Sequence, residues 1–221
     1  MREVLTYARR GSRFSDKQQA AWDAHHEEWV IPDEAVDAAG FSFADAFGRE
    51  APLVVEIGSG VGEATAALAA TRPDCNVLAL EVWRPGVAET LGRLAAAGAD
   101  NVRLCSLDAV WTLQHLLGPS SITELWTFFP DPWHKTRHHK RRLVNPANAA
   151  IVADRLVPGG TWRLATDWAD YAEQMVTVLD AEPRLDGGVV PRWSERPVTK
   201  FERKGVAKGR AITDLCYRRV G

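Results

Sequence analysis

The stretch 128–142, FFPDPWHKTRHHKRR, is the most informative part of the sequence. Pro130 and Pro132 hold the backbone extended and stiff on either side of Asp131. Trp133 offers a flat face on which a base can stack, and the cations that follow suit a phosphate backbone. A turn with solvated cations is the alternative, but it leaves unexplained why acid, aromatic and cations occur together. The stretch therefore predicts a place that receives a nucleobase.

The segment 56–62, EIGSGVG, has the composition of a ligand-binding turn, because glycines let a backbone approach a ligand closely. The fingerprint of dinucleotide-binding proteins has the spacing G-x-G-x-x-G, whereas the spacing here is G-x-G-x-G. Glu63 stands where that fingerprint has its third glycine, and its charge would repel a pyrophosphate. S-adenosylmethionine carries no phosphate, so Gly58 and Gly60 are better suited to that ligand.

Three acids occur where three successive strands are expected to end. Glu56 closes the first strand and could face the ammonium group of S-adenosylmethionine. Glu81 closes the second and could accept from both ribose hydroxyls, and Asp108 follows the third and could accept from the adenine amino group. One such acid would favour a helix cap or a solvated side chain. Three of them together with the glycine turn indicate a class I methyltransferase.

The elements that must position these residues alternate along the chain from residue 52. Strands are predicted over 52–57, 76–80, 101–105, 123–129 and 161–166, and helices over 62–71, 85–97, 109–117, 146–156 and 168–180. Pro158-Gly159-Gly160 is expected to stop the helix before the fifth strand. Such alternation requires a mostly parallel sheet, because a helix supplies each crossover. We therefore expect a doubly wound α/β fold whose ligands bind outside the carboxyl ends of the strands.

The ends of the chain extend this core into a single predicted domain, 1–221. Residues 1–50 are interpreted as a basic N-terminal arm, a helix over 16–29 and a connecting loop over 30–50. Residues 51–180 form the expected cofactor-binding core, and 181–221 form a substrate-contacting segment of two strands around a basic loop.

The charge distribution indicates a polyanionic partner although the net charge is only -2. Residues 1–13, 133–142 and 196–219 hold 17 of the 27 Lys and Arg residues but 3 of the 29 acids. An acidic body with three basic segments is typical of a localised nucleic-acid site, although each segment alone could be a solvated loop.

Other features narrow the class of protein. No apolar run approaches the roughly 20 residues of a membrane span, and no apolar region follows the basic N-terminus as in a signal peptide. Cys75, Cys105 and Cys216 are far apart, which argues against a zinc site or disulfides and favours a cytoplasmic protein. Three histidines lie between cations, so we expect phosphate contacts or solvation from them and no metal; they are His134, His138 and His139.

The segments PDPWHKTRHHKRR and EIGSG closely resemble those of the bacterial tRNA (guanine-N7)-methyltransferases. The resemblance continues in RRGSRFSDKQQAAW near the N-terminus, in Ala165-Thr166-Asp167 and in RPVTKFER over 196–203. It covers the chain from about residue 9 to its end, in the same order.

This resemblance implies transfer of a methyl group from S-adenosylmethionine to N7 of a variable-loop guanosine in tRNA. It implies that Glu56, Glu81 and Asp108 bind S-adenosylmethionine, and that Asp131 lies at both the cofactor and the reacting base as the catalytic residue. Substrate contacts are implied for Lys135, Asp167, Thr199, Lys200, Phe201 and Glu202. RNA contacts are implied for Arg137, His138, His139, Lys140, Arg141 and Arg142.

Guanine N7 carries no proton, so the expected reaction needs no general base and depends on positioning and electrostatics. Asp131 could stabilise the charge that builds on the purine, or accept from guanine N1–H and the amino group. The 199–202 segment can act only if it folds back over the strand ends. A monomer and a homodimer both remain open.

Three alternatives also remain open. A class I methyltransferase could act on another RNA or another guanine atom, and an RNA-binding protein could keep this fold without catalysis. A nicotinamide-dependent oxidoreductase is disfavoured by the glycine spacing.

Overall fold

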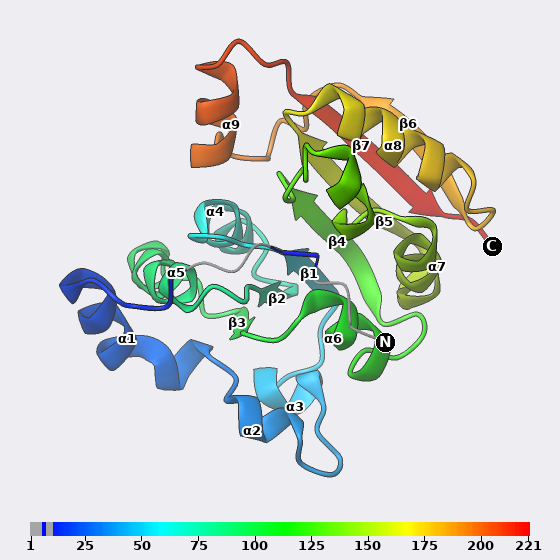
Figure 1. Ribbon diagram of the computed structural model, residues 1–221. Helices are drawn as coiled ribbons and strands as arrows, with labels where there is room; N and C mark the ends of the chain where they lie inside the picture. The colour runs from blue at the N-terminus through cyan, green and yellow to red at the C-terminus, as the bar shows by residue number, and fades with distance from the viewer. Residues whose placement is uncertain (1–5, 8–10) are drawn as a thin grey trace.

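A computed structural model describes residues 6–7 and 11–221 of the chain (Figure 1). Most of the expected basic arm, residues 1–5 and 8–10, lies outside the described residues. The strands are β1 (Leu53–Ile57), β2 (Asn76–Leu80), β3 (Val102–Cys105), β4 (Ile122–Phe128), β5 (Leu156–Thr166), β6 (Leu185–Val190) and β7 (Thr213–Arg219). The longer helices are α1 (Asp16–Trp29), α4 (Glu63–Ala70), α5 (Arg84–Ala97), α7 (Pro146–Arg155) and α8 (Ala169–Asp180). The shorter ones are α2 (Asp33–Val36), α3 (Phe43–Phe47), α6 (Ala109–His115), α9 (Lys200–Val206) and the 3-10 helix η1 (Thr136–Arg141).

The strands of the described residues form one sheet in the order β3-β2-β1-β4-β5-β7-β6. β1 to β5 run parallel, and β7 is antiparallel to both β5 and β6. The strand order reverses between β1 and β4, and ligands of open α/β sheets bind at such a reversal. This confirms the predicted mostly parallel α/β fold.

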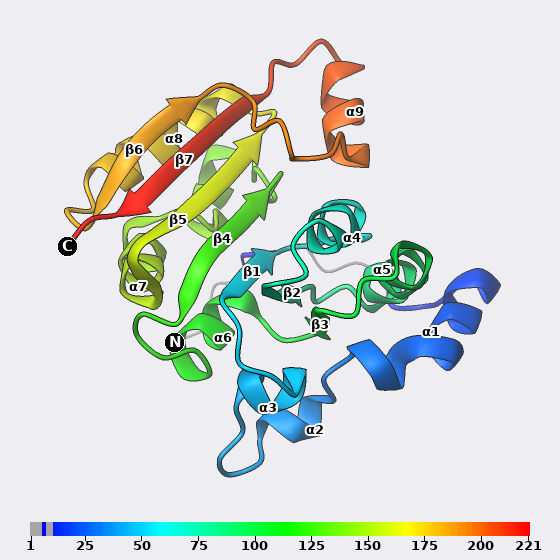
Figure 2. The ribbon, with the colours of Figure 1, turned by 180° about the vertical axis from the view of Figure 1, so that it is seen from behind.

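The core fills both faces of the sheet, because apolar side chains of the central strands point to each face in turn. All five residues of β2 are buried. Leu78 and Leu80 belong to a core with α6, α7 and α8, whereas Val77 and Ala79 pack with α4 and α5. Figures 1 and 2 show these two sets of helices on opposite faces of the sheet. Burial of each large apolar side chain contributes about 1.5–3 kcal/mol.

The prediction of a connecting loop over 30–50 is wrong, since these residues contain α2 and α3. Ser42 caps α3 by accepting from the Asp45 amide, and Phe43 and Phe47 are buried in the core. Five residues are too few for a helical period to be visible in the sequence. The predicted basic loops likewise contain η1 and α9, and Thr199 caps α9 by accepting from the Glu202 amide.

The predicted role of Pro158-Gly159-Gly160 is also wrong. α7 ends at Arg155 and β5 begins at Leu156, so these residues lie inside the strand. The pairing of β4 with β5 shifts register between Ile122 and Glu124. A side chain at Gly160 would meet backbone oxygens of β4, so glycine permits this close approach.

Candidate active site

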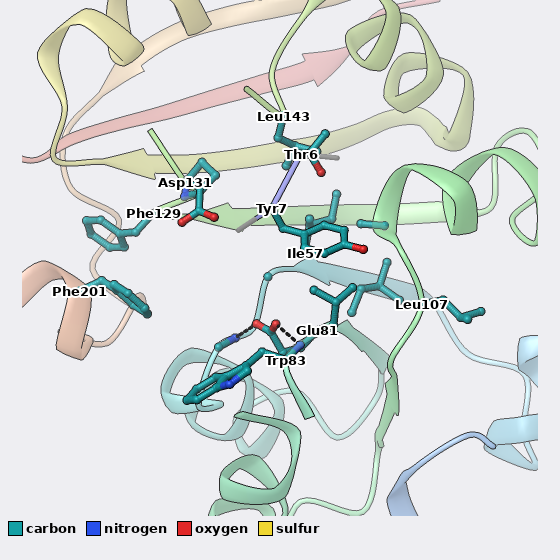
Figure 3. Close-up of a pocket in the computed structure, with 16 residues that line it drawn as sticks. Thr6, Tyr7, Ile57, Glu81, Trp83, Leu107, Phe129, Asp131, Leu143 and Phe201 are labelled. Atoms are coloured by element: carbon teal, nitrogen blue, oxygen red, sulfur yellow. Dashed lines mark hydrogen bonds between the residues drawn. The ribbon is translucent and has the colours of Figure 1, made fainter. Parts of the chain in front are cut away.

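A cavity opens at the carboxyl ends of β1, β2 and β4, as the strand-end rule predicts (Figure 3). It measures about 800 Å³ including its open mouth, which lies within the roughly 300–1,000 Å³ of small-molecule pockets. Gly58, Gly60, Glu81, Asp131 and Phe201 are among the residues that line it. The loops after β1, β2 and β4 and the helix α9, far apart in the sequence, thus contribute to one cavity.

The glycine turn after β1 has the backbone that its composition predicts. Gly58, Gly60 and Gly62 all have φ between 62° and 75°, in the left-handed region that glycine adopts without steric cost. A side chain at Gly62 would collide with Thr90 of α5, so this glycine also permits close helix packing. The turn therefore forms one wall of the cavity with no side chains in the way.

Glu81 is held by the backbone around it. One carboxylate oxygen accepts from the Gly60 amide at 2.7 Å and the other accepts from the Trp83 amide at 2.8 Å. These hydrogen bonds, dashed in Figure 3, join the end of β2 to the glycine turn and fix the carboxylate at the cavity wall. A carboxylate fixed in this way is suited to accept from neighbouring hydroxyls of a ligand.

Glu56 lies in a smaller hollow that shares Gly58, Phe129 and Phe201 with the main cavity. Its side chain is buried and accepts from Thr65 Oγ1 at 2.5 Å. Burial disfavours the charged form and raises the pKa of Glu56 to about 7; the Thr65 hydrogen bond opposes this and the Glu81 charge adds to it.

Ser59 lines the same hollow with an unsatisfied hydroxyl. Its Oγ is buried and has no hydrogen-bond partner among the described residues. Buried polar groups are nearly always hydrogen-bonded, so an orphaned hydroxyl beside a buried carboxyl fits a ligand with a polar end there.

Asp108 does not itself line the cavity, but its sequence neighbours Leu107 and Ala109 do. Its Oδ1 accepts from the Trp111 amide at 2.9 Å and so caps α6. The helix-cap alternative is therefore correct for this oxygen. The adenine contact expected from Asp108 stays a prediction.

Asp131 points into the cavity from the side opposite Glu81 (Figure 3). Phe129 and Trp133, two residues before and after it, have φ of 54° and 45°. Left-handed backbone at such bulky residues costs about 1–3 kcal/mol each and persists only where the surroundings hold it. The Phe129 amide donates to the Ala165 carbonyl at 2.7 Å, and Trp133 Nε1 donates to the Thr6 carbonyl at 3.0 Å. The loop is thus not uniformly extended as the prolines predicted.

The basic run after Asp131 divides into exposed and covered side chains. Lys135, Arg137 and Lys140 are exposed. The Arg141 guanidinium lies 3.6 Å from the centroid of the Trp133 ring and donates to the Tyr7 carbonyl. One face of Trp133 is therefore covered by Arg141, and stacking of a base on the ring stays a prediction.

His138 and His139 are half-buried on η1. His139 Nε2 lies 3.8 Å from a carboxylate oxygen of Asp170. Arg142 differs from the rest of the run, because only 1% of its side chain is exposed. Its guanidinium is covered by protein atoms, which disfavours the RNA contact expected from Arg142.

The C-terminal segment folds back over the glycine turn, as its expected role requires. Phe201 lines both hollows and lies against Gly60. Thr199 lines the smaller hollow, and Lys200 is exposed beside it. Glu202 is buried instead, and its carboxylate accepts from Arg196 at 2.6 Å and Arg192 at 2.9 Å. This segment brings Thr199 and Phe201 to the site and turns Glu202 toward two arginines.

Asp167, after β5, is paired with Arg210 at 2.5 Å and lies against α9 at Gly205. The Arg210 guanidinium stacks over Trp168, which also stacks with His134. His134 belongs to the loop 129–135 between β4 and η1, called the proline loop below. Sequence reasoning assigned no role to Arg196 or Arg210. Arg210 is 43 residues from Asp167, and Arg196 also pairs with Asp214, which is 18 residues away, so residue types at short spacing gave no signal for these pairs.

The glycine turn, the strand-end acids and the strand order define a class I methyltransferase. Solved structures with this fold include a 16S rRNA (adenine(1408)-N(1))-methyltransferase from Catenulisporales acidiphilia, with TM-score 0.55 and 16% identity over 81% of this chain and 90% of that chain. An rRNA methylase from Streptococcus thermophilus has TM-score 0.51 and 17% identity over 77% of this chain and 88% of that chain. These likenesses show the fold alone.

Sequence comparison defines the family within this class. A family model described as putative methyltransferase matches residues 50–215. The curated tRNA (guanine-N(7)-)-methyltransferase of a Nocardioides species is 71% identical over 100% of this chain and 89% of its own length. That of Cutibacterium acnes is 49% identical over 99% of this chain and 84% of its own length. The chain belongs to the tRNA (guanine-N7)-methyltransferase family.

Proposed function

We propose that this chain transfers a methyl group from S-adenosylmethionine to N7 of a variable-loop guanosine in tRNA. The observation that carries the proposal is the cavity in which Asp131 faces Glu81, with the exposed cations of η1 following Asp131 along the chain. Membership of the tRNA (guanine-N7)-methyltransferase family supports the same reaction.

S-adenosylmethionine fits the side chains present at this site and would supply a methyl group on a positively charged sulfur. Glu56 and Ser59 would hold its amino-acid end, since a buried carboxyl and an orphaned hydroxyl suit an ammonium and a carboxylate. Glu81 would accept from the ribose hydroxyls, and Asp108 from the adenine amino group. Gly58 and Gly60 would let the backbone approach the ligand.

The contribution of Asp131 would be electrostatic. Because guanine N7 has a free lone pair, the residues of this chain need not remove a proton, and the reaction depends on how base and methyl donor are aligned. A carboxylate at Asp131 would stabilise the positive charge on the purine or accept from its N1–H and amino group. The backbone around Asp131 supports this role, since strained residues flank it on both sides.

The tRNA would lie across η1 and α9. Lys135, Arg137, His138, His139, Lys140 and Arg141 would contact its phosphates. Asp167, Thr199, Lys200 and Phe201 would contact the substrate around the reacting guanosine. Glu202, buried on α9, would hold this segment in place through its pairs with Arg196 and Arg192. We propose a cytoplasmic protein, because its three cysteines are free. Among the described helices, none is long and apolar enough to cross a membrane. No group of described His, Cys, Asp and Glu side chains could hold a metal ion.

The experiment that tests the proposal is a methyl-transfer assay with purified protein, labelled S-adenosylmethionine and unmodified bulk tRNA. The product is digested to nucleosides, and the expected label is in 7-methylguanosine. Label in a different nucleoside would retain methyl transfer and contradict the N7 assignment. No label, from folded protein that binds both ligands, would favour an RNA-binding protein without catalysis.

A further inference from the structure

Arg142 is buried at the end of the basic run, whereas Lys135, Arg137 and Lys140 of the same run are exposed. Its Nε donates to the Pro132 carbonyl at 2.8 Å. Its two terminal nitrogens donate to Gln174 Oε1 at 2.8 Å and to Asp170 Oδ2 at 2.5 Å. The guanidinium also lies 4.7 Å from the centroid of the Tyr171 ring. Arg142 thus connects the proline loop to three residues of α8.

The carbonyl that Arg142 holds belongs to the residue directly after Asp131. On the other side of Asp131, the Phe129 amide donates to the Ala165 carbonyl of β5. Asp131 therefore lies between two backbone anchors, one on β5 and one on α8 through Arg142. Both anchors stand next to a residue with left-handed backbone, which the surroundings must hold in place.

We propose that Arg142 is a positioning residue, which fixes the Pro132 carbonyl and thereby aims the Asp131 carboxylate into the cavity. The proposal rests on the proposed function, because it assigns Arg142 to the same methyl transfer. Arginine suits the role for a geometric reason: its planar fork satisfies acceptors in three directions at once, whereas lysine offers one nitrogen.

The electrostatics around Arg142 agree with an internal role. Asp170 is half-exposed, and burial opposes its ionisation, but the hydrogen bond and charge of Arg142 outweigh this and lower its pKa. His139 adds to the lowering from 3.8 Å. The Arg142 charge is therefore already compensated within the protein and has little to offer a phosphate.

The first test compares Arg142→Lys with Arg142→Met. We expect both variants to lower kcat at saturating tRNA and S-adenosylmethionine at least tenfold, with the tRNA KM and the salt dependence of tRNA binding as in the wild type. Loss of an RNA phosphate contact would instead lower the slope of log affinity against log salt by about 1. Near-wild-type kcat in Arg142→Lys would overturn the proposal, since that variant keeps the charge.

Asp170→Asn is a second variant, for which a positioning role and an RNA-binding role of Arg142 predict different changes in kcat and tRNA affinity. If Arg142 positions Asp131, weakening its ion pair lowers kcat and leaves tRNA affinity unchanged. If Arg142 binds RNA, freeing it from Asp170 tightens tRNA binding and preserves kcat, which would overturn the proposal. Asp170→Asn also changes the contact between Asp170 and His139. His139→Ala, measured in parallel, shows how much of the change in kcat or tRNA affinity comes from that contact.

Arg103→Met is the matched control for loss of a partly buried arginine. Arg103 donates to the Ala46 carbonyl and stacks over Phe47, away from the cavity. It should lower thermal stability while kcat is retained. Amide hydrogen exchange over residues 128–135 provides a readout without activity: exchange should rise in Arg142→Lys and Asp170→Asn and not in Arg103→Met. An inactive wild type would contradict the proposed function, and unchanged exchange would contradict the role of Arg142.

Discussion

The carboxylate of Glu63, in the first turn of α4, accepts a hydrogen bond from the backbone amide of Lys200, in the first turn of α9. It also accepts from the Arg203 guanidinium at 2.6 Å. The helix that follows the glycine turn thereby holds the C-terminal segment over that turn. Burial opposes ionisation of Glu63, but these hydrogen bonds outweigh it, so its pKa lies below the ordinary value of 4.5.

We expect Glu63→Ala to weaken S-adenosylmethionine binding about tenfold, because a charged hydrogen bond contributes about 1.5–3 kcal/mol and α9 places Phe201 over the cavity. Isothermal titration with S-adenosylmethionine measures the change. Glu89→Ala, which removes an exposed i,i+4 pair with Arg93, is the control and should bind normally. Since the pKa of Glu63 is lowered, its contribution to stability is present above pH 4.5 and is lost as the pH falls through the lowered value.

Asp131→Asn should lower kcat about 100-fold or more, because the side chain keeps its shape and loses the charge that would stabilise the purine. Single-turnover methyl transfer to tRNA measures the chemical step apart from product release. S-adenosylmethionine and tRNA affinities, measured on the same variant, show whether binding survives. Turnover within a few-fold of the wild type would contradict a catalytic role for Asp131.

Glu56→Gln should change how stability depends on pH. The folded protein raises the pKa of Glu56 from 4.5 to about 7, so it binds this proton more tightly than the unfolded chain. The stability that this provides is present below pH 4.5 and is lost as the pH rises through about 7, by about 3 kcal/mol in total. Glutamine cannot ionise, so the variant should be the more stable protein at pH 8 and equal to the wild type at pH 4. Urea unfolding at both pH values measures this; parallel pH curves would contradict it.

S-adenosylmethionine affinity gives a second readout for Glu56. If its carboxylate holds the ligand's ammonium, the wild-type affinity should rise with pH up to about 7, because only the ionised form attracts a cation. Glu56→Gln should bind weakly and without this rise. A wild-type affinity that is constant between pH 5 and 7 would remove the ammonium contact from the proposal.

Lys140→Ala should weaken tRNA binding and lower the slope of log affinity against log salt by about 1, since Lys140 is exposed on η1 and suited to a phosphate. Filter binding across a salt series measures the slope. Arg49→Gln is the control. Arg49 Nε donates to Asn76 Oδ1 at the start of β2, whereas the cavity lies at the carboxyl ends of the strands. Equal slopes for wild type and Lys140→Ala would contradict a phosphate contact at this residue.

Arg196→Met should destabilise the protein by about 3–5 kcal/mol, because it leaves the buried Asp214 carboxylate without its cation and Glu202 with Arg192 alone. Arg196 is fully buried and pairs with Glu202 at 2.6 Å and Asp214 at 2.9 Å. Chemical denaturation measures the loss. Arg218→Met, which removes an exposed arginine from β7, should change stability by less than about 1 kcal/mol. A loss of similar size in both variants would contradict a special role for the buried network.

Much of the scaffold is predictable because its signals are local. The helix over 16–29 and the strand over 76–80 occupy the predicted residues, and the Ser15 side chain caps the former. An apolar run, a capping residue and a glycine turn each act over a few residues, so they can be read along the chain. Once the strands are parallel, their ends share one edge, and this brings Glu56, Glu81 and Asp131 to one side of the sheet.

Three adjacent cations show that local sequence does not determine which side chains become buried. Lys140 is exposed, Arg141 stacks on Trp133, and Arg142 is buried against α8. Their chemistry is nearly the same, and their separate fates depend on partners such as Asp170, which is 28 residues further along the chain. Sequence reasoning treated them alike for that reason.

The sequence by itself determined the α/β class, the glycine turn, the strand-end acids and the family, because each depends on residue types at short spacing. The tertiary structure decided which of these side chains meet. Glu63 and Lys200 are 137 residues apart, and Asp167 and Arg210 are 43 residues apart. Such contacts depend on how whole elements pack, and packing is a property of the folded chain that no short segment carries.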